Sequence, residues 1–271
     1  MIIKKSKTAW RVLRERGLFS VFNLLKHYFG FAKHVNEGTL ILDYFKSISF
    51  IGTKIDIGAH HGFDTLPFAT EGWKVFAFEP DPYNRAQLEK LTSKFCSVHV
   101  DARAVSNKAA KQVVFYKSSE SDGVSGLQAF LPSHQAEYHV DVTTLAEFIL
   151  EKEINEIDFL KIDTEGYDKM VLKGIPWESL RPRLILCEFE DKKTLPLGYS
   201  YHDLAKYLLE RGYHLIVSEW KPIKRYGEKH DWRGFYPYPH KLQTPKAWGN
   251  LIAARDKADY ESLSQFIKVK K

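Results

Sequence analysis

KIDIGAHHG, residues 54–62, joins an apolar run typical of a buried strand to a glycine-containing turn that leads into a helical pattern. Asp56 lies within the run, and Gly58 and Gly62 frame the turn. Glycine allows a sharp bend and a close approach of the backbone to a ligand, and the N-terminus of the next helix offers free N–H groups. The segment therefore predicts a ligand-binding turn at the carboxyl end of a first strand.

Similar apolar runs alternate with helical patterns along the chain. KIDIG (54–58), VFAF (75–78) and FLKID (159–163) lack polar alternation, as parallel strands covered on both faces do. Strands separated by single helices predict a doubly wound α/β sheet. The predicted strands cover residues 53–57, 74–78, 97–100, 157–162, 184–189, 214–218 and 251–254. The predicted helices cover residues 62–70, 82–94, 145–152, 166–173, 200–211 and 256–266.

Two long segments interrupt this alternation. Residues 112–143 contain two β-like runs, 113–117 and 140–142, around a polar loop. Residues 221–249 are rich in Pro, Trp, Tyr and basic residues and match neither the helical nor the strand period. Loops of this length inside a compact domain are usually functional or disordered, and the aromatic content argues against disorder.

The charge of the 271-residue chain is unevenly distributed. Residues 1–35 hold eight Lys and Arg against one acid, and residues 220–271 hold twelve against five, so each end carries +7 within a formal net charge of +6. The acidic centre would oppose a phosphate backbone, and we expect no nucleic-acid partner. The two cysteines, Cys96 and Cys187, lie far apart and predict neither a disulfide framework nor a zinc cluster.

Residues 1–45 are predicted to form an N-terminal amphipathic helical appendage, followed by one domain over residues 46–271. Leu18, Phe22, Leu25 and Phe29 share one helical face with basic residues around it. Two interpretations stay open: the helix packs on the core, or residues 6–30 contact an anionic membrane surface. No apolar run there reaches the ~18–20 residues that span a bilayer, and charges interrupt any signal peptide. We expect a cytoplasmic protein, with any membrane contact peripheral.

Two acidic residues indicate the chemistry of the ligand. Asp56 beside the first turn would repel a phosphate and attract an amino group. Glu79 follows the second strand, 21 residues beyond Gly58, where a carboxylate can accept both hydroxyls of a ribose. Alternatively, the two acids only cap two βα turns. An adenosine joined to a cationic amino acid is S-adenosylmethionine. The predicted cofactor contacts are Asp56, Gly58, Ala59, His60, Gly62, Glu79, Pro80, Asp101 and Asp163.

Four motifs carry a family resemblance. DIGAHHG (56–62), AFEPDP (77–82), DFLKIDTEGYDKMVLKG (158–174) and LILCEFE (184–190) resemble, in order and spacing, the motifs of FkbM-type S-adenosylmethionine-dependent methyltransferases. The resemblance implies a class I methyltransferase fold, Rossmann-like and doubly wound, with a mostly parallel seven-stranded sheet. It also implies O-methylation of a hydroxyl on a small-molecule or glycan acceptor, such as a sugar or a secondary metabolite.

The end of the strand at 157–162 carries the candidate catalytic residues. A sulfonium methyl is already activated, so the protein has to position the acceptor and supply a base for its proton. Asp163 and Glu165 are the first candidates, and His60 is a further one. Alternatively, one carboxylate caps the next helix and the other holds the amino-acid end of the cofactor. Glu188 or Glu190 could complete a Mg²⁺ site with them, but we predict no metal.

The aromatic segment 221–249 is interpreted as a wall of the acceptor site. Trp232, Tyr236 and Arg233 suit a carbohydrate that stacks on rings or carries an anionic substituent. The alternative is an apolar cluster that packs a C-terminal extension. Two alternative functions remain. One is an NAD-dependent oxidoreductase, which Asp56 and the missing third glycine of a dinucleotide motif argue against. The other is a non-catalytic membrane-tethered adaptor, which the basic N-terminus favours.

Overall fold

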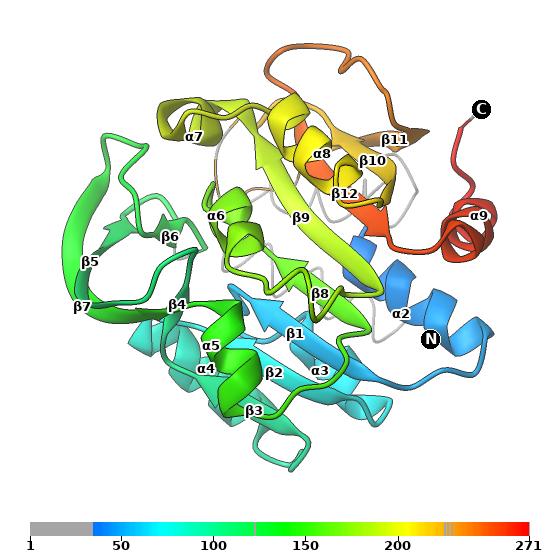
Figure 1. The fold of residues 1–271 in the computed structure, drawn as a ribbon. Coiled ribbons are helices and arrows are strands. Elements are labelled where there is room, and N and C mark those ends of the chain that lie inside the picture. Colours follow the sequence, from blue (N-terminus) through cyan, green and yellow to red (C-terminus); the bar gives the residue numbers. More distant parts are fainter. Residues whose placement is uncertain (1–34, 122, 225, 227, 229, 271) are drawn as a thin grey trace, which may run out of the picture.

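The centre of the fold is an eight-stranded sheet with the strand order β11-β10-β12-β9-β8-β1-β2-β3 (Figure 1). The computed structural model describes residues 35–270 apart from 122, 225, 227 and 229. The five strands from β9 to β3 are parallel, and β12, β10 and β11 each run antiparallel to the preceding neighbour. Its strands are β1 (Thr53–Ile57), β2 (Lys74–Phe78), β3 (Val98–Asp101), β8 (Phe159–Ile162), β9 (Leu184–Glu190), β10 (His214–Trp220), β11 (Trp232–Pro237) and β12 (Trp248–Ala254).

The predicted seven-stranded sheet is wrong by one strand. The additional strand, β11, lies within residues 221–249, whose sequence matches neither the helical nor the strand period, and it pairs with β10 at the edge of the sheet. Gly234 and Pro237 lie within it and hide the strand pattern. An edge strand tolerates both residues because only one of its sides joins the hydrogen-bond ladder.

Helices cover both faces of the sheet, as the doubly wound prediction requires (Figure 1). One face packs against α5, α6 and α8 through residues such as Phe148 and Leu204, and the other against α2, α3 and α9 through Phe45 and Leu263. The helices are α2 (Glu37–Ser47), α3 (Thr65–Thr70), α4 (Pro82–Thr92), α5 (Leu145–Glu151), α6 (Asp168–Lys173), α7 (Asp191–Thr194), the 3-10 helix η1 (Leu195–Leu197), α8 (Tyr201–Leu209) and α9 (Lys257–Phe266).

Helix α2 is hydrogen-bonded to strands from the C-terminal part of the chain. Glu37, at its start, is 6% exposed and accepts hydrogen bonds from Ser218 and Trp220 of β10 and from Asn250 of β12. The amphipathic segment predicted over residues 6–30 lies outside the described residues. The division into residues 1–45 and 46–271, and the choice between core packing and membrane contact, therefore stay predictions.

A second sheet of four strands, in the order β4-β7-β5-β6, lies toward the carboxyl ends of β1 and β8 (Figure 1). It is built around the segment in which the sequence predicted two β-like runs, both of which extend further than predicted. Phe115 and Val140 form its small core. Its strands are β4 (Ala104–Val105), β5 (Ala110–Ser118), β6 (Ser125–Gly126) and β7 (His134–Thr143).

The register of the parallel strands brings three turns to one edge. Ile57 of β1 is paired with Phe78 of β2 and with Ile162 of β8, so these three strands end level with one another. The residues that follow them, Gly58, Glu79 and Asp163, are therefore neighbours. Chain connections leave this point in opposite directions, toward β2 and β3 on one side and toward β9 on the other, which makes it the switch point where such sheets bind ligands.

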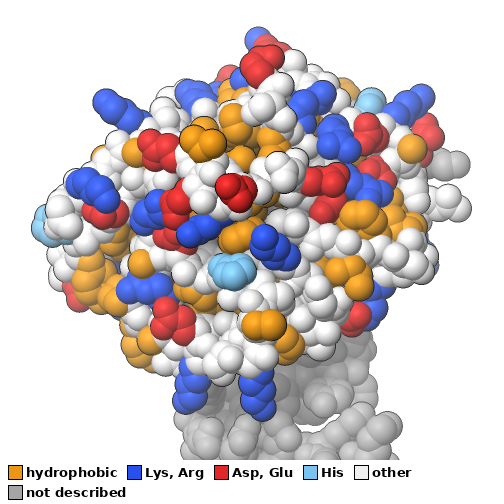
Figure 2. Space-filling model, turned by 60° about the horizontal axis from the view of Figure 1, so that its bottom comes forward, with side chains coloured by type: hydrophobic (Ala, Val, Ile, Leu, Met, Phe, Trp, Pro, Cys, Tyr) orange, Lys and Arg blue, Asp and Glu red, His pale blue; other side chains and the backbone are white. Residues whose placement is uncertain are grey.

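One face of the molecule carries charges of both signs (Figure 2). Figure 2 shows the lower face of Figure 1 turned toward the viewer, where Lys and Arg side chains are interspersed with Asp and Glu and with hydrophobic side chains. Within residues 35–270, every helix is too short or too polar to cross a membrane. The expected absence of a nucleic-acid partner stays a prediction.

Candidate active site

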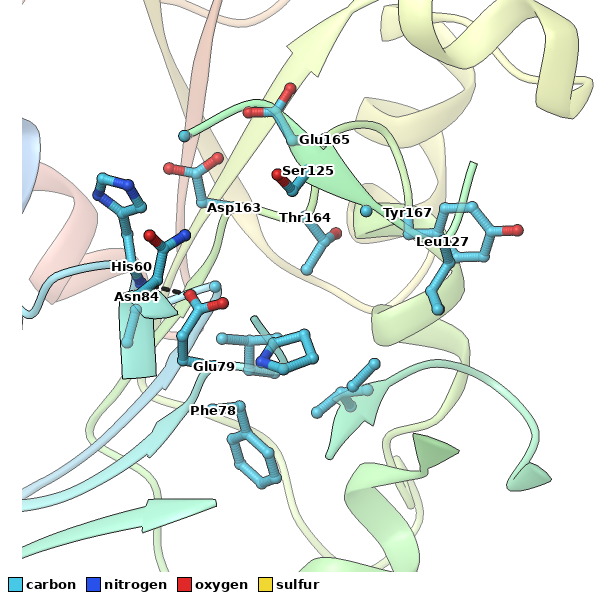
Figure 3. A pocket seen from close by; sticks show the side chains of 18 of the residues that line it. His60, Phe78, Glu79, Asn84, Ser125, Leu127, Asp163, Thr164, Glu165 and Tyr167 are labelled. Carbon is cyan, nitrogen blue, oxygen red and sulfur yellow. Dashed lines mark hydrogen bonds between the residues drawn. The ribbon is translucent and has the colours of Figure 1, made fainter. Parts of the chain in front are cut away.

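A cavity of about 280 Å³ opens at the switch point between β1 and β8 (Figure 3). The turns after β1, β2 and β8 form one side of it, and the second sheet closes the other with Phe115, Ser125 and Leu127. Most of the residues predicted to bind the cofactor or act in catalysis line it together. They are Gly58, Ala59, His60, Glu79, Pro80, Asp163 and Glu165.

The turn after β1 tolerates few residue types at its two glycine positions. Gly58 has a φ of +77°, and a Cβ at this position would lie 1.9 Å from the backbone oxygen of Asp163. The approach of the β8 turn therefore requires glycine at this position. At Gly62 a Cβ would lie 2.6 Å from the Leu88 side chain, so this glycine serves the packing of α4 and does not line the cavity.

Glu79 is held by the backbone of two turns. Its Oε2 accepts the N–H of His60 at 2.7 Å (Figure 3). Its Oε1 accepts the N–H of Asp81 at 2.9 Å. The side chain is almost fully buried, and burial raises the pKa of Glu79 to about 7 despite these two hydrogen bonds. Both oxygens keep acceptor positions for a further donor, because a carboxylate offers about four lone-pair directions.

Asp56 lies beneath the turn and does not line the cavity. Its carboxylate is completely buried, where it accepts hydrogen bonds from the Lys54 ammonium at 2.8 Å and from the Thr65 hydroxyl at 2.7 Å. The acid that faces the cavity on this side is Asp163, which is partly exposed and lies 3.3 Å from the ammonium of Lys161. An amino group of a ligand would therefore meet Asp163 rather than Asp56.

Asp101 and His60 also have partners that the sequence did not suggest. Asp101, at the end of β3, is bound by the guanidinium of Arg103 through both oxygens, and it is Arg103 that lines the cavity. The His60 ring stacks on His61, with ring centres 3.8 Å apart, while its backbone N–H holds Glu79. Asp101 as a cofactor contact and His60 as a base stay predictions.

Glu165 belongs to a buried cluster of charges. The Lys193 ammonium lies 2.8 Å from Glu165, 2.8 Å from Glu188 and 3.1 Å from Glu190. Tyr226 donates a hydrogen bond to Glu190 from the far side. Burial raises the pKa of Glu165 to about 7, while the Lys193 ammonium opposes the rise; burial also raises the pKa of Glu188 well above its usual range. One cation therefore faces three carboxylates.

A divalent cation has a possible ligand set in the same place. One oxygen from each of Asp163, Glu165 and Glu188 lies within 4.8 Å of the others. The Lys193 ammonium already lies among the Glu165 and Glu188 carboxylates and neutralises part of their charge. Because a lysine supplies the positive charge here, we retain the prediction that no metal is used.

The sequence did not single out two lysines that organise the site. Lys161 lies within 4 Å of carboxylate oxygens of Asp56, Asp64 and Asp163, and Lys193 joins the cluster around Glu165. For Lys161 a signal was present, since a lysine in the apolar run FLKI of a central strand needs an acidic partner. For Lys193, in a polar stretch after β9, the sequence held no comparable signal.

The described residues of the aromatic segment 221–249 do not line this cavity. Trp232 and Phe235 pack with α2 and α9 on one face of the sheet, and Tyr236 and Tyr238 pack on the other. Residues 222–224, 226 and 245–247 instead line a second cavity beside β9. The aromatic residues of β11 thus pack on the sheet, and the acceptor-side role of segment 221–249 stays a prediction.

A sequence model described as the methyltransferase FkbM domain matches residues 56–215. Among solved structures, a precorrin-6y C5,15-methyltransferase from Geobacter metallireducens is 12% identical, with a TM-score of 0.41 over 80% of this chain and 86% of that chain. A TehB-like SAM-dependent methyltransferase from Corynebacterium glutamicum is also 12% identical, with a TM-score of 0.40 over 93% and 97%. These scores are too low to add to the assignment. Curated proteins give no significant match.

The matched residues begin at Asp56 in β1 and extend to Leu215 in β10, so they include all the turns that form the cavity. They make up more than half of the chain. The family implies S-adenosylmethionine as the methyl donor. On this match, the protein belongs to the FkbM methyltransferase family and is an S-adenosylmethionine-dependent methyltransferase.

Proposed function

We propose that the protein transfers the methyl group of S-adenosylmethionine to a hydroxyl of a sugar, a glycan or a secondary metabolite. The observation that carries the proposal is the position of Glu165, a buried carboxylate with a pKa of about 7, in the same cavity as Glu79. A base with a pKa near the working pH combines a large ionised fraction with a useful affinity for the proton.

The chain's own residues fit the donor. Glu79 has an acceptor position left on each oxygen for the two ribose hydroxyls, and Asp163 offers a partly exposed carboxylate to the amino group. The absence of a side chain at Gly58 keeps the turn close to the β8 loop. When bound, the donor supplies a methyl group on a positively charged sulfur, which needs no covalent help from the protein.

Glu165 would take the proton of the acceptor hydroxyl. Its backbone φ of +54° lies in the left-handed region, and the Lys193 ammonium holds the side chain at the cavity. This position is over-determined by the cluster around it, as expected for a residue that has to be placed accurately. Asp163 is the second candidate, and His60 the third.

Donor binding and methyl transfer can be measured separately. We expect S-adenosylhomocysteine, and not NAD, to bind in a calorimetric titration. With labelled donor and a panel of hydroxylated acceptors, Glu165→Gln should lose about 10²–10⁴ in turnover while it binds S-adenosylhomocysteine normally. Glu71→Gln, on the surface, is the matched control. Normal turnover in both Glu165→Gln and Asp163→Asn would remove the two carboxylates from catalysis.

The two other functions make different predictions in the same experiment. A dinucleotide oxidoreductase would bind NAD and ignore S-adenosylhomocysteine. A non-catalytic adaptor would label no acceptor, even when the donor binds. Membership of a methyltransferase family supports the transferase over both. A peripheral membrane contact through residues 6–30 is a separate proposal, to be tested by sedimentation with anionic vesicles at rising salt.

A further inference from the structure

One side chain of the second sheet reaches both the proposed base and its ammonium partner. Gln128 follows β6 and is partly buried. Its side-chain amide donates to the backbone carbonyl of Glu165 at 3.0 Å and to that of Lys193 at 3.1 Å. An amide nitrogen carries two hydrogens, so it can serve both carbonyls at once. The two carbonyls come from separate parts of the chain, the turn after β8 and helix α7, and Gln128 joins them.

This contact depends on glycine at position 166. Gly166 has a φ of +99°, and a Cβ there would lie 2.6 Å from the amide nitrogen of Gln128 and 3.0 Å from the Cβ of Lys193. The first distance is too short for two atoms that are not bonded, so a side chain at this position would push the amide away. The sequence EG at 165–166 is therefore needed for the approach of Gln128.

The backbone around Glu165 needs support of this kind. Glu165 itself has a φ of +54°, a conformation that costs about 1–3 kcal/mol and persists only where neighbours hold it. Asp168 accepts the N–H of Thr164 at 3.3 Å, and the Tyr199 hydroxyl donates to the carbonyl of Gly166 at 2.5 Å. Gln128 holds the carbonyl between them and differs from both, because its second hydrogen bond goes to Lys193.

The distance between the Glu165 carboxylate and the Lys193 ammonium, 2.8 Å, decides how easily Glu165 ionises. Burial raises the pKa of Glu165 to about 7, and Lys193 opposes the rise, whereas the nearby negative charges add to it. The groups that face Glu165 are Lys193, Asp163, Glu188, Glu190 and Tyr226. Because Lys193 is the cation of this set, a small movement of its backbone would change the proton affinity of Glu165.

We propose that Gln128 is a positioning residue for methyl transfer, because it holds the backbones of Glu165 and Lys193 together and so keeps the base at its ammonium partner. Gln128 does not line the cavity, and it acts only through these two residues. The inference rests on the proposed role of Glu165 as the base. It gives the second sheet a part in catalysis beyond closing one side of the cavity.

The proton affinity of Glu165 can be followed without donor or acceptor. In the full chain labelled with ¹³C at the glutamate carboxyl groups, the signal of Glu165 is the one lost in Glu165→Gln. Its chemical shift is then followed from about pH 5 to about pH 9. Gln128→Met keeps a side chain of similar length and removes both donors. We expect the midpoint of Glu165 to move to higher pH, because an ammonium held less closely favours the ionised form less.

Gln135→Met is the matched control, since Gln135 lies in β7 of the same sheet and is exposed. It should leave the midpoint of Glu165 where it is in the wild type. An unchanged or lower midpoint in Gln128→Met, or an equal shift in the control, would overturn the proposal.

Gly166→Ala tests the same contact from the other side. Its Cβ displaces the amide of Gln128, so it should also move the midpoint of Glu165 to higher pH. If both substitutions act through the one contact, the double variant should shift the midpoint no further than the larger single shift. Additive shifts would show two independent effects and would contradict the proposal.

Turnover gives a second measurement with any acceptor that the hydroxylated panel identifies. Gln128→Met should lower kcat by about tenfold to a hundredfold, because the base is displaced, and should leave the KM for S-adenosylmethionine unchanged. The acid limb of its kcat profile should move to higher pH together with the midpoint of Glu165. An unchanged kcat with a raised KM for the donor would overturn the positioning role.

The outcomes separate this proposal from the proposed function. If Glu165→Gln keeps normal turnover, Glu165 is not the base, whatever Gln128→Met does. If Glu165→Gln loses turnover while Gln128→Met keeps both the wild-type midpoint and the wild-type turnover, the base stands and the positioning role of Gln128 fails.

Discussion

The two halves of the large sheet form their parts of the site in different ways. On the β1–β2 side, Gly58, His60 and Glu79 lie on two turns, which are joined by the hydrogen bond from the backbone N–H of His60 to the Glu79 carboxylate. On the β8–β9 side, Glu165 lies in the turn after β8 and Glu190 at the end of β9, and the two meet at an ammonium group carried by α7. The first half depends on backbone geometry, and the second on a balance of buried charge. Substitutions should therefore affect the halves in different ways.

Removing the cation should have the largest effect on stability. Lys193→Met leaves three buried carboxylates without their ammonium, and breaking such a cluster costs about 3–5 kcal/mol of unfolding free energy. The loss should shrink at lower pH, where the carboxylates protonate. Urea unfolding at two pH values measures both effects. Lys206→Met, on the surface of α8, is the control and should stay within about 0.5 kcal/mol.

The backbone of the other half is tested by Gly58→Ala. The new Cβ would overlap the backbone oxygen of Asp163, and the left-handed conformation adds strain of its own, for a total of about 3 kcal/mol. Gly72→Ala separates the two contributions, because Gly72 has a φ of +83° but a Cβ added to it would meet no atom within 4 Å. Equal losses in the two variants would show that strain alone decides.

Of the two carboxylates with a raised pKa, only Glu79 in the first half should matter for donor binding. Glu79→Ala is expected to weaken S-adenosylhomocysteine binding by about 2–3 kcal/mol, since two hydroxyls lose a charged acceptor. Glu165→Gln should leave this affinity unchanged. If both substitutions weaken donor binding equally, the separation of the site into two halves is wrong. Isothermal titration gives both affinities directly.

The pH dependence of donor binding is the smallest of these effects. Burial raises the pKa of Glu79 to about 7. Ribose hydroxyls donate to the ionised form, so affinity should fall as the pH drops below about 7, by at most tenfold per pH unit, and level off above it. Glu79→Gln should remove this dependence. A wild-type profile that is flat between pH 5 and 8 would contradict the assignment.

The sequence alone predicts most residues of the first half of the site, because the residue patterns that indicate them lie close together in the chain. The apolar run, the glycines and Glu79 follow one another in two short motifs, and the structure places Gly58, Ala59, His60, Glu79 and Pro80 around one cavity. The sequence predicts Asp56 as a cofactor contact, but Asp56 does not line the cavity, and the reason is physical. It still belongs to β1, which ends at Ile57, so its side chain points from the face of the strand rather than from its end.

The second half was less predictable because its partners are distant. Lys193 meets Glu165 only after β9 and the loops around it are in place, and Tyr226 approaches from a segment without a recognisable period. The sequence does not predict the extra strand β11 for a related reason, since an edge strand with glycine and proline shows little alternation of polar and apolar residues. Contacts of this kind are decided by tertiary packing rather than by local propensity.

The position of β12 has a consequence for the order of assembly. It is the last strand of the described residues, yet it lies between β9 and β10. On the ribosome, the stretch from the end of β10 at Trp220 to the end of β12 at Ala254 takes about 2–7 s to synthesise. During that interval β9 and β10 each have an open hydrophobic edge, and Glu37 of α2 cannot reach Asn250. The helix that emerges first among the described elements therefore completes its hydrogen bonds only when the final strand is in place.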